Sequence, residues 1–372
     1  MKNIIDYVAQ EKDNFLDKAF NSVDSLVLSQ FSYLNLNGLV PDMSGVVKPV
    51  SIGEITHKLN HNTLTNRVRD SESNLKLLHA LANSPRFSNT KITFYVEKID
   101  FQTEKQFSAT TYLLEDGTAY IAFRGTDASF VGWKEDFNMA FISPIPSQEE
   151  GVKYVRAVGG ILSCDLRIGG HSKGGNIAVY SAIKCDMSIK NRITHIFSHD
   201  GPGFSDEIFL SQDYLSVKER IHKTIPQSSI IGMLMQNQEN YIVVKSNRFW
   251  FMQHDPFSWL VDGDKFQYVK TVNSSALFMN KTLNNWISSI DDSKRELFVD
   301  TLYHVIKSSG ATSFYDLTGD WFKKAVAILG AIKDIDDETR SFIFKTIGSL
   351  FVLAVKNLRV TRLENQRELM IK

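Results

Sequence analysis

One segment near the middle of the chain constrains its fold more than any other, because a strand, a turn and a helix follow one another in it without a break. The run from Leu166 to Ile168 is typical of a short strand, and the apolar spacing that begins at Asn176 is typical of a helix. The segment GGHSKGGN between them leaves no residues for a longer loop. Such a direct strand-to-helix turn predicts a sheet whose strands alternate with helices.

The same alternation extends over the central part of the chain. Six short runs rich in β-branched and aromatic residues lie between Lys91 and about Gly263, namely ITFYVEKI, TTYLLE, TAYIAF, LRIGG, RITHIFS and YIVVKS. The sequence EDGT at 115–118 predicts a hairpin, so the first strands are expected to be antiparallel. The predicted fold class is therefore α/β, with a mostly parallel sheet flanked by helices on both faces.

Changes in periodicity divide the chain into three expected regions. Residues 1–86 are expected to form an N-terminal helical layer, whose helix around Leu78 ends before Pro85. Residues 87–270 are expected to form the α/β core, in which the apolar segment 204–251 either folds over the sheet as a cap or packs into the core. Residues 271–372 are expected to form a C-terminal helical subdomain, because apolar residues recur there at helical spacing.

Composition and charge exclude several classes of protein. Lysine plus arginine and aspartate plus glutamate number 42 each, so no bulk positive charge attracts nucleic acid or another polyanion. The two cysteines lack metal-ligand spacing, and the N-terminus lacks an apolar signal segment, so a cytoplasmic location is expected, without metal or cofactor. The longest apolar stretch, 342–355, contains Lys345 and is too short for a transmembrane helix, which leaves peripheral membrane contact open. The sequence does not indicate an oligomeric state.

Ser172 stands at the centre of the strand-to-helix turn. The segment GHSKG matches the pattern G-x-S-x-G, in which glycines remove side chains that would collide around a serine on a strained turn. The helix that starts after Ser172 directs its free backbone N–H groups towards the serine, where they can stabilise an oxyanion. Ser172 is therefore the candidate nucleophile, and the N–H of Lys173 is a candidate oxyanion donor.

Further motifs resemble those of a known family. The sequence FRGT, followed by GWKED at 132–136, resembles the FRGT and D-W-x-x-D signature of class 3 lipases, which have the α/β-hydrolase fold. Together with GHSKGGN and QHDPFSW, it is most similar to the Mbeg-like branch of lipase-like bacterial proteins, over about residues 31–260. The resemblance implies that Thr126 donates its backbone N–H, and its hydroxyl, to the oxyanion. It also implies that Arg124 stabilises this loop, through Asp136.

A serine nucleophile needs a base and an orienting carboxylate, which in this fold follow the serine in the order acid, then histidine. Asp200 follows the RITHIFS run, at the end of a strand where ligand-facing residues gather, and is the candidate acid. His254, in the loop after YIVVKS, is the candidate base. His171 and His199 lie too close in sequence to the serine and the acid, and His222 is expected in a helix.

One departure from the family concerns the acid. Class 3 lipases carry it after the next strand, where this chain has TIPQSS at 224–229 without a carboxylate. Asp200 corresponds to the position that some other lipases use, and Asp255 is a further alternative because it adjoins His254.

These residues predict a serine-dependent hydrolase of carboxylic esters, a lipase or esterase with an ester or lipid substrate. Two alternatives stay open, a binding module that keeps the turn only as scaffold and an acyltransferase. The pairs His199-Asp200 and His254-Asp255 suggest a third, a metal-dependent phosphohydrolase, but they follow strands and not helices.

Overall fold

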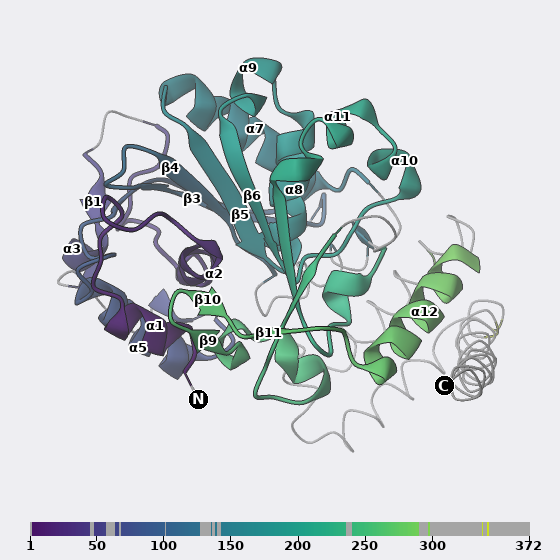
Figure 1. Cartoon of the computed structure of the whole chain (residues 1–372). Helices are drawn as coiled ribbons and strands as arrows, with labels where there is room; N and C mark the ends of the chain where they lie inside the picture. Colours follow the sequence, from purple (N-terminus) through teal and green to yellow (C-terminus); the bar gives the residue numbers. More distant parts are fainter. Residues whose placement is uncertain are drawn as a thin grey trace. The chain divides into compact units, whose positions relative to one another are not determined.

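The computed structural model describes residues 2–44, 48–56, 64–66, 68–100, 102–126, 143–235 and 240–289, together with residues 135, 138, 139, 297, 337 and 341. The chain forms two compact units, one of residues 1–127 and 143–272 and the other of residues 128–142 and 273–372. The first unit holds the sheet (Figure 1). It also holds all the residues of the candidate site that the structure describes.

A mixed sheet forms the centre of the first unit. Within the described residues it has nine strands in the order β1-β2-β3-β4-β5-β6-β7-β8-β11. The strands β4 to β8 are parallel to one another, and the outer pairs are antiparallel. The strand bounds are β1 Val50–Ser51, β2 Lys91–Asp100, β3 Lys105–Leu113, β4 Ala119–Phe123, β5 Leu166–His171, β6 Ile193–His199, β7 Ile221–Pro226, β8 Ile242–Val244 and β11 Tyr268–Val269. The predicted mostly parallel α/β sheet is confirmed.

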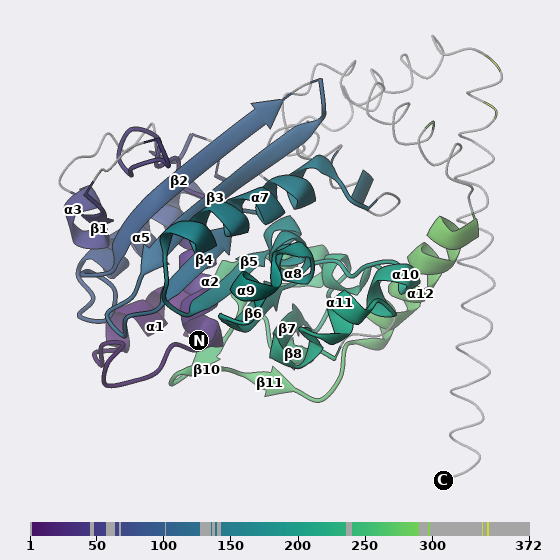
Figure 2. The ribbon, with the colours of Figure 1, turned by 90° about the horizontal axis from the view of Figure 1, so that it is seen from above.

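Helices cover both faces of this sheet (Figure 1). One face packs against α1 Ile4–Gln10, α2 Ser22–Phe31 and α5 Ser71–Ala82, and the other against α7 Pro146–Ile161 and α8 Lys173–Lys184. The strand β4 shows how the sequence separates the faces, because Tyr120 points into the core of the N-terminal helices and Ile121 into that of α7 and α8. Both side chains are fully buried. In Figure 2, α7 lies along the long β3 strand.

The remaining elements are short and connect the strands. They are α3 Ile52–Thr56, α9 Met187–Lys190, α10 Asp206–Phe209, α11 Gln212–Leu215, η1 Lys218–Arg220, η2 Ile231–Met233, η3 Trp250–His254 and η4 Pro256–Ser258. The strands β9 Val261–Asp262 and β10 Lys265–Phe266 form a separate antiparallel pair. In the second unit the structure describes the helix α12 Ser274–Ser289.

Two local predictions are confirmed and one is wrong. The predicted hairpin joins β3 to β4, with the Leu114 N–H donating to the Thr118 carbonyl and Gly117 at a φ of 80°. The helix around Leu78 is α5, which ends at Ala82. His222, expected in a helix, lies on β7, because this strand pairs with β6 on one side and β8 on the other, and the pairing overrides the local pattern.

The segment 204–251, predicted as a cap, contains two strands of the sheet itself, β7 and β8. The described part of this segment therefore belongs partly to the sheet. A cap over the sheet stays a prediction only for the residues that connect these strands. The three-region organisation also stays a prediction, and most of the expected C-terminal helical subdomain lies outside the described residues. Among the helices that the structure describes, none combines the length and the apolar character needed to cross a bilayer.

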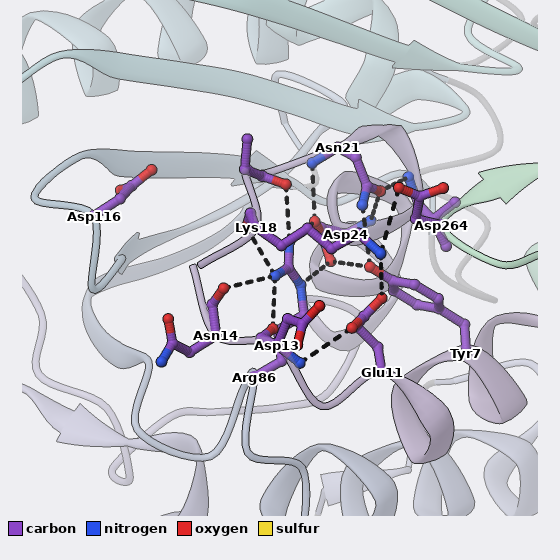
Figure 3. Close-up of polar contacts among 12 residues, drawn as sticks. Tyr7, Glu11, Asp13, Asn14, Lys18, Asn21, Asp24, Arg86, Asp116 and Asp264 are labelled. Carbon is purple, nitrogen blue, oxygen red and sulfur yellow. Dashed lines mark hydrogen bonds and ion pairs between the residues drawn. The ribbon is translucent and has the colours of Figure 1, made fainter. Parts of the chain in front are cut away.

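A buried ion pair holds the N-terminal layer together (Figure 3). The Arg86 guanidinium donates to both carboxylate oxygens of Asp24, at 2.9 and 2.7 Å, and both side chains are fully buried. Arg86 also donates to the backbone carbonyls of Asp13, Asn14, Lys18 and Ala19. The Asp24 carboxylate accepts from the Tyr7 hydroxyl at 2.8 Å and from the Asn21 N–H at 2.9 Å. The pair thus joins α1, the loop after it, α2 and the turn after α5.

Breaking this pair should cost much more stability than breaking an exposed one. The substitution Arg86→Met leaves the Asp24 charge buried, so we expect the free energy of unfolding to fall by about 3–5 kcal/mol. The matched control is Lys76→Met, which breaks the exposed Lys76–Glu72 pair on α5 and should change stability by no more than about 0.5 kcal/mol. Urea unfolding followed by circular dichroism measures both, and equal losses would contradict the assigned role of Arg86.

Candidate active site

Ser172 occupies a strained turn between β5 and α8. Its backbone has a φ of 58° and a ψ of −131°, values that a residue with a side chain rarely adopts. Ser172 is the N-cap of α8, and its N–H donates to the His199 carbonyl at 2.8 Å. His171 and His199 are paired in the parallel register of β5 and β6. Ser172 and Asp200, the residues that follow them, therefore leave the sheet side by side.

Glycines allow the backbone to pack this closely around Ser172. A Cβ atom at Gly174 would lie 2.0 Å from the Phe123 carbonyl oxygen, and one at Gly170 would lie 2.3 Å from the Gly174 carbonyl carbon. Gly125 is also restricted, because its Cβ would lie 2.7 Å from the His171 carbonyl oxygen and 3.1 Å from the Ser172 Cβ. The ends of β4 and β5 and the first turn of α8 consequently meet with backbone against backbone.

The structure brings Ser172, His254 and Asp200 together in one hydrogen-bonded series. His254 Nε2 lies 3.0 Å from Ser172 Oγ, and His254 Nδ1 lies 2.6 Å from Asp200 Oδ2. Asp200 is fully buried, Ser172 is 9% exposed and the His254 side chain is 20% exposed, so the carboxylate lies in the interior and the histidine is the most exposed member of the series. Because the carboxylate accepts from Nδ1, Nε2 is left to accept the serine proton.

The Asp200 carboxylate has two further donors, which no sequence pattern predicted. Its Oδ1 accepts from the Ser229 hydroxyl at 2.5 Å and from the Gly232 N–H at 3.1 Å. A Cβ at Gly232 would lie 2.3 Å from this oxygen, so only glycine fits there. Ser229 belongs to the TIPQSS segment, where class 3 lipases carry their acid. In this chain that position supports the carboxylate of Asp200.

The Asp255 carboxylate is not a hydrogen-bond partner of the His254 side chain, and it binds other residues of the same loop. It pairs with Arg248 and accepts from the Phe257 N–H at 3.0 Å. Gln253, on the other side of His254, accepts from the Ser228 N–H at 2.7 Å through its side chain. These contacts hold the histidine loop on both sides of His254.

The two candidate oxyanion donors come from separate segments of the chain. Lys173 is the first residue of α8, and its side chain is buried and donates to the Gln106 carbonyl at 3.0 Å, so only its backbone is available at the turn. Thr126 follows Gly125, whose backbone abuts Ser172. Arg124 pairs with Glu97 at 2.8 Å. Its expected partner Asp136 lies outside the described residues.

His199 is buried beside the site, and both nitrogens of its ring are hydrogen-bonded to hydroxyl groups. Its Nδ1 lies 2.7 Å from Thr224 Oγ1 and its Nε2 lies 2.9 Å from Ser25 Oγ. Burial disfavours the charged ring and lowers the pKa of His199 to about 3. The described part of the chain contains no group of three His, Cys, Asp or Glu side chains arranged to hold a metal ion. The predicted metal-dependent alternative therefore has no geometric support among these residues.

The strand order, the strained serine turn and the helices on both faces define a lipase-like α/β-hydrolase fold. The chain belongs to the Mbeg1-like family, whose sequence model matches residues 81–304. A search of curated proteins finds no match.

Solved structures with a similar fold are lipases of low sequence identity. The chain is similar to the Rhizomucor miehei lipase propeptide complex, with 15% identity and a TM-score of 0.38 over 59% of this chain and 66% of that one. It is also similar to M37 lipase, with 14% identity and a TM-score of 0.36 over 58% and 70%. The chain is also similar to the Lip2 lipase from Yarrowia lipolytica, with 15% identity and a TM-score of 0.34 over 59% of this chain and 76% of that one. The match thus spans somewhat less than two thirds of the first of these chains.

A methyl group at the turn should disrupt it. The substitution Gly174→Ala forces the α8 helix away from β4, and we expect the free energy of unfolding to fall by about 3 kcal/mol. The control is Gly160→Ala on α7, where the new methyl would meet no atom within 4 Å and should stabilise the helix by about 0.5 kcal/mol. Urea unfolding measures both variants. A stable Gly174→Ala protein would contradict the close packing described for the turn.

Proposed function

We propose that this chain is a serine-dependent carboxylic ester hydrolase that acts through an acyl-enzyme at Ser172. The observation that carries the proposal is the hydrogen-bonded series from Ser172 Oγ through His254 to the buried Asp200 carboxylate. A nucleophile, a base and an orienting acid in this arrangement are the requirements of acyl transfer to serine. The substrate is an ester or a lipid.

In the proposed reaction, Ser172 Oγ attacks the ester carbonyl carbon while its proton passes to His254 Nε2. The carbonyl oxygen becomes an oxyanion, which the backbone N–H groups of Lys173 and Thr126 stabilise. When the tetrahedral intermediate collapses, the bond to the alkoxy group breaks and His254 returns the proton to the leaving alcohol. A water molecule then attacks the acyl-enzyme, with His254 again as base, and releases the carboxylic acid and free Ser172.

Asp200 has two functions in this scheme. It accepts a hydrogen bond from the Nδ1–H of His254, which keeps Nε2 free to act as base, and its charge stabilises the imidazolium that forms. The donors Ser229 and Gly232 hold the carboxylate in place. A non-catalytic binding module was suggested by the missing carboxylate in TIPQSS. That reason loses its force because Asp200 contacts His254. The acyltransferase alternative, in which the acyl group passes to an alcohol, would use the same residues. The cytoplasmic location stays a prediction.

Removing the nucleophile tests the proposal directly. The Ser172→Ala variant should lose p-nitrophenyl ester hydrolysis down to the uncatalysed rate while its far-UV spectrum stays that of the wild type. A fluorophosphonate probe should label the wild type at Ser172 and leave the variant unlabelled, as mass spectrometry would show. Equal hydrolysis by both proteins would refute the role of Ser172.

A second pair of substitutions separates the two candidate acids. Asp200→Asn keeps the shape but lets His254 adopt the wrong tautomer, so we expect kcat to fall by about 10⁴-fold. Asp255→Asn should retain most of kcat, because its carboxylate faces Arg248 and the Phe257 N–H. Steady-state kinetics on p-nitrophenyl esters measures both. The opposite order of effects would make Asp255 the acid.

A further inference from the structure

The side chain of His171, the residue before the nucleophile, links two parts of the site that are distant in sequence. Its Nε2 lies 2.8 Å from the backbone carbonyl oxygen of His254, and its Nδ1 lies 3.2 Å from the Tyr33 hydroxyl. The His171 and His254 rings are 4.5 Å apart between centroids. Only 4% of His171 is exposed.

These partners determine the protonation of the His171 ring. A carbonyl oxygen can only accept, so Nε2 must carry the hydrogen that it donates to His254. In a neutral ring Nδ1 then has a free lone pair and accepts from the Tyr33 hydroxyl. Burial, with a smaller effect of the neighbouring His254, holds the pKa of His171 well below its usual value, so the ring stays neutral. Both nitrogens therefore have the partner that this tautomer needs.

Tyr33 extends the link to the segment that follows β4. It lies just after α2, and a Cβ atom at Gly125 would come within 2.2 Å of its hydroxyl oxygen. Gly125 directly precedes Thr126, the candidate oxyanion donor. Tyr33 and His171 thus join the loop of Thr126, the serine turn and the main chain of His254. Elsewhere in the described part of the histidine loop, the Gln253 side chain accepts from the Ser228 N–H and the Asp255 carboxylate from the Phe257 N–H.

We propose that His171 is a positioning residue, whose neutral ring holds the main chain of His254 so that its Nε2 stays within hydrogen-bonding distance of Ser172. Tyr33 secures the tautomer that makes this bond. The proposal rests on the proposed function, because it assigns His171 a role in keeping the base aligned with the nucleophile. His171 itself touches neither the substrate nor the proton in transfer.

Two substitutions at His171 separate this role from simple packing. His171→Phe keeps an aromatic ring but removes both hydrogen bonds, and a displacement of the base by about 1 Å should lower kcat by about 10²-fold. The KM should change little. His171→Gln keeps an N–H donor at the end of the side chain and should recover most of kcat. The rates are expressed per active site titrated with a fluorophosphonate, so that unfolded protein does not count.

Tyr33→Phe provides a milder test. It removes the hydroxyl that donates to His171 Nδ1, but His171 Nε2–H can still donate to the His254 carbonyl. We expect a loss of kcat smaller than that of His171→Phe. A wild-type kcat in His171→Phe would overturn the proposal. Equal losses in His171→Phe and His171→Gln would also overturn it, since they would assign the effect to the shape of the ring.

NMR spectra of protein labelled with ¹⁵N-histidine distinguish failure of this inference from failure of the proposed function. The wild type should show His171 as a neutral Nε2–H tautomer at pH 7. An Nδ1–H tautomer or a charged ring in a protein that still reacts with fluorophosphonate would refute only the role of His171. A wild type that shows the Nε2–H tautomer but neither reacts with the probe nor hydrolyses esters would refute the proposed function, and the positioning role of His171 with it.

Discussion

The site depends on one close contact, that between the first turn of α8 and the end of β4. Gly174 lies so near the Phe123 carbonyl that a single methyl group would not fit. This contact sets the position of α8, whose N-terminus carries Ser172 in its strained conformation and presents the Lys173 N–H. The strain is tolerable because β5, β6 and α8 hold the turn from several sides. Ser172, the proposed nucleophile, is therefore positioned by backbone packing.

The carboxylate of Asp200 is the most demanding group that this arrangement has to accommodate. A fully buried charge is unfavourable unless hydrogen bonds replace the water that it loses. His254, Ser229 and Gly232 supply these bonds from three separate segments. Electrostatics also explains why a serine, and not a second carboxylate, stands at position 229. A second carboxylate beside Asp200 would repel its charge, whereas the Ser229 hydroxyl donates a hydrogen bond to it.

The N-terminal layer supports the site from the opposite face of the sheet. Ser25 of α2 contacts both the Tyr120 hydroxyl at 2.8 Å and the Nε2 of His199 at 2.9 Å. His199 is the last residue of β6, so these bonds hold the strand end from which Asp200 extends. The buried Arg86–Asp24 pair in turn fixes the start of α2. Residues far from Ser172 in sequence thereby determine the position of Asp200.

The sequence by itself determined the class of fold, the hairpin before β4 and the serine turn, because these follow from periodicity, turn chemistry and glycine spacing within short segments. It also indicated Asp200 and His254 as candidates from their places after strands. Only the tertiary structure decided that Asp200 and not Asp255 contacts His254, that Arg124 pairs with Glu97, that His222 lies on a strand, and that Ser229, Gly232 and His171 adjoin the site. These contacts join residues dozens of positions apart, and local sequence patterns carry no information on which distant backbone and side-chain groups meet when the sheet closes.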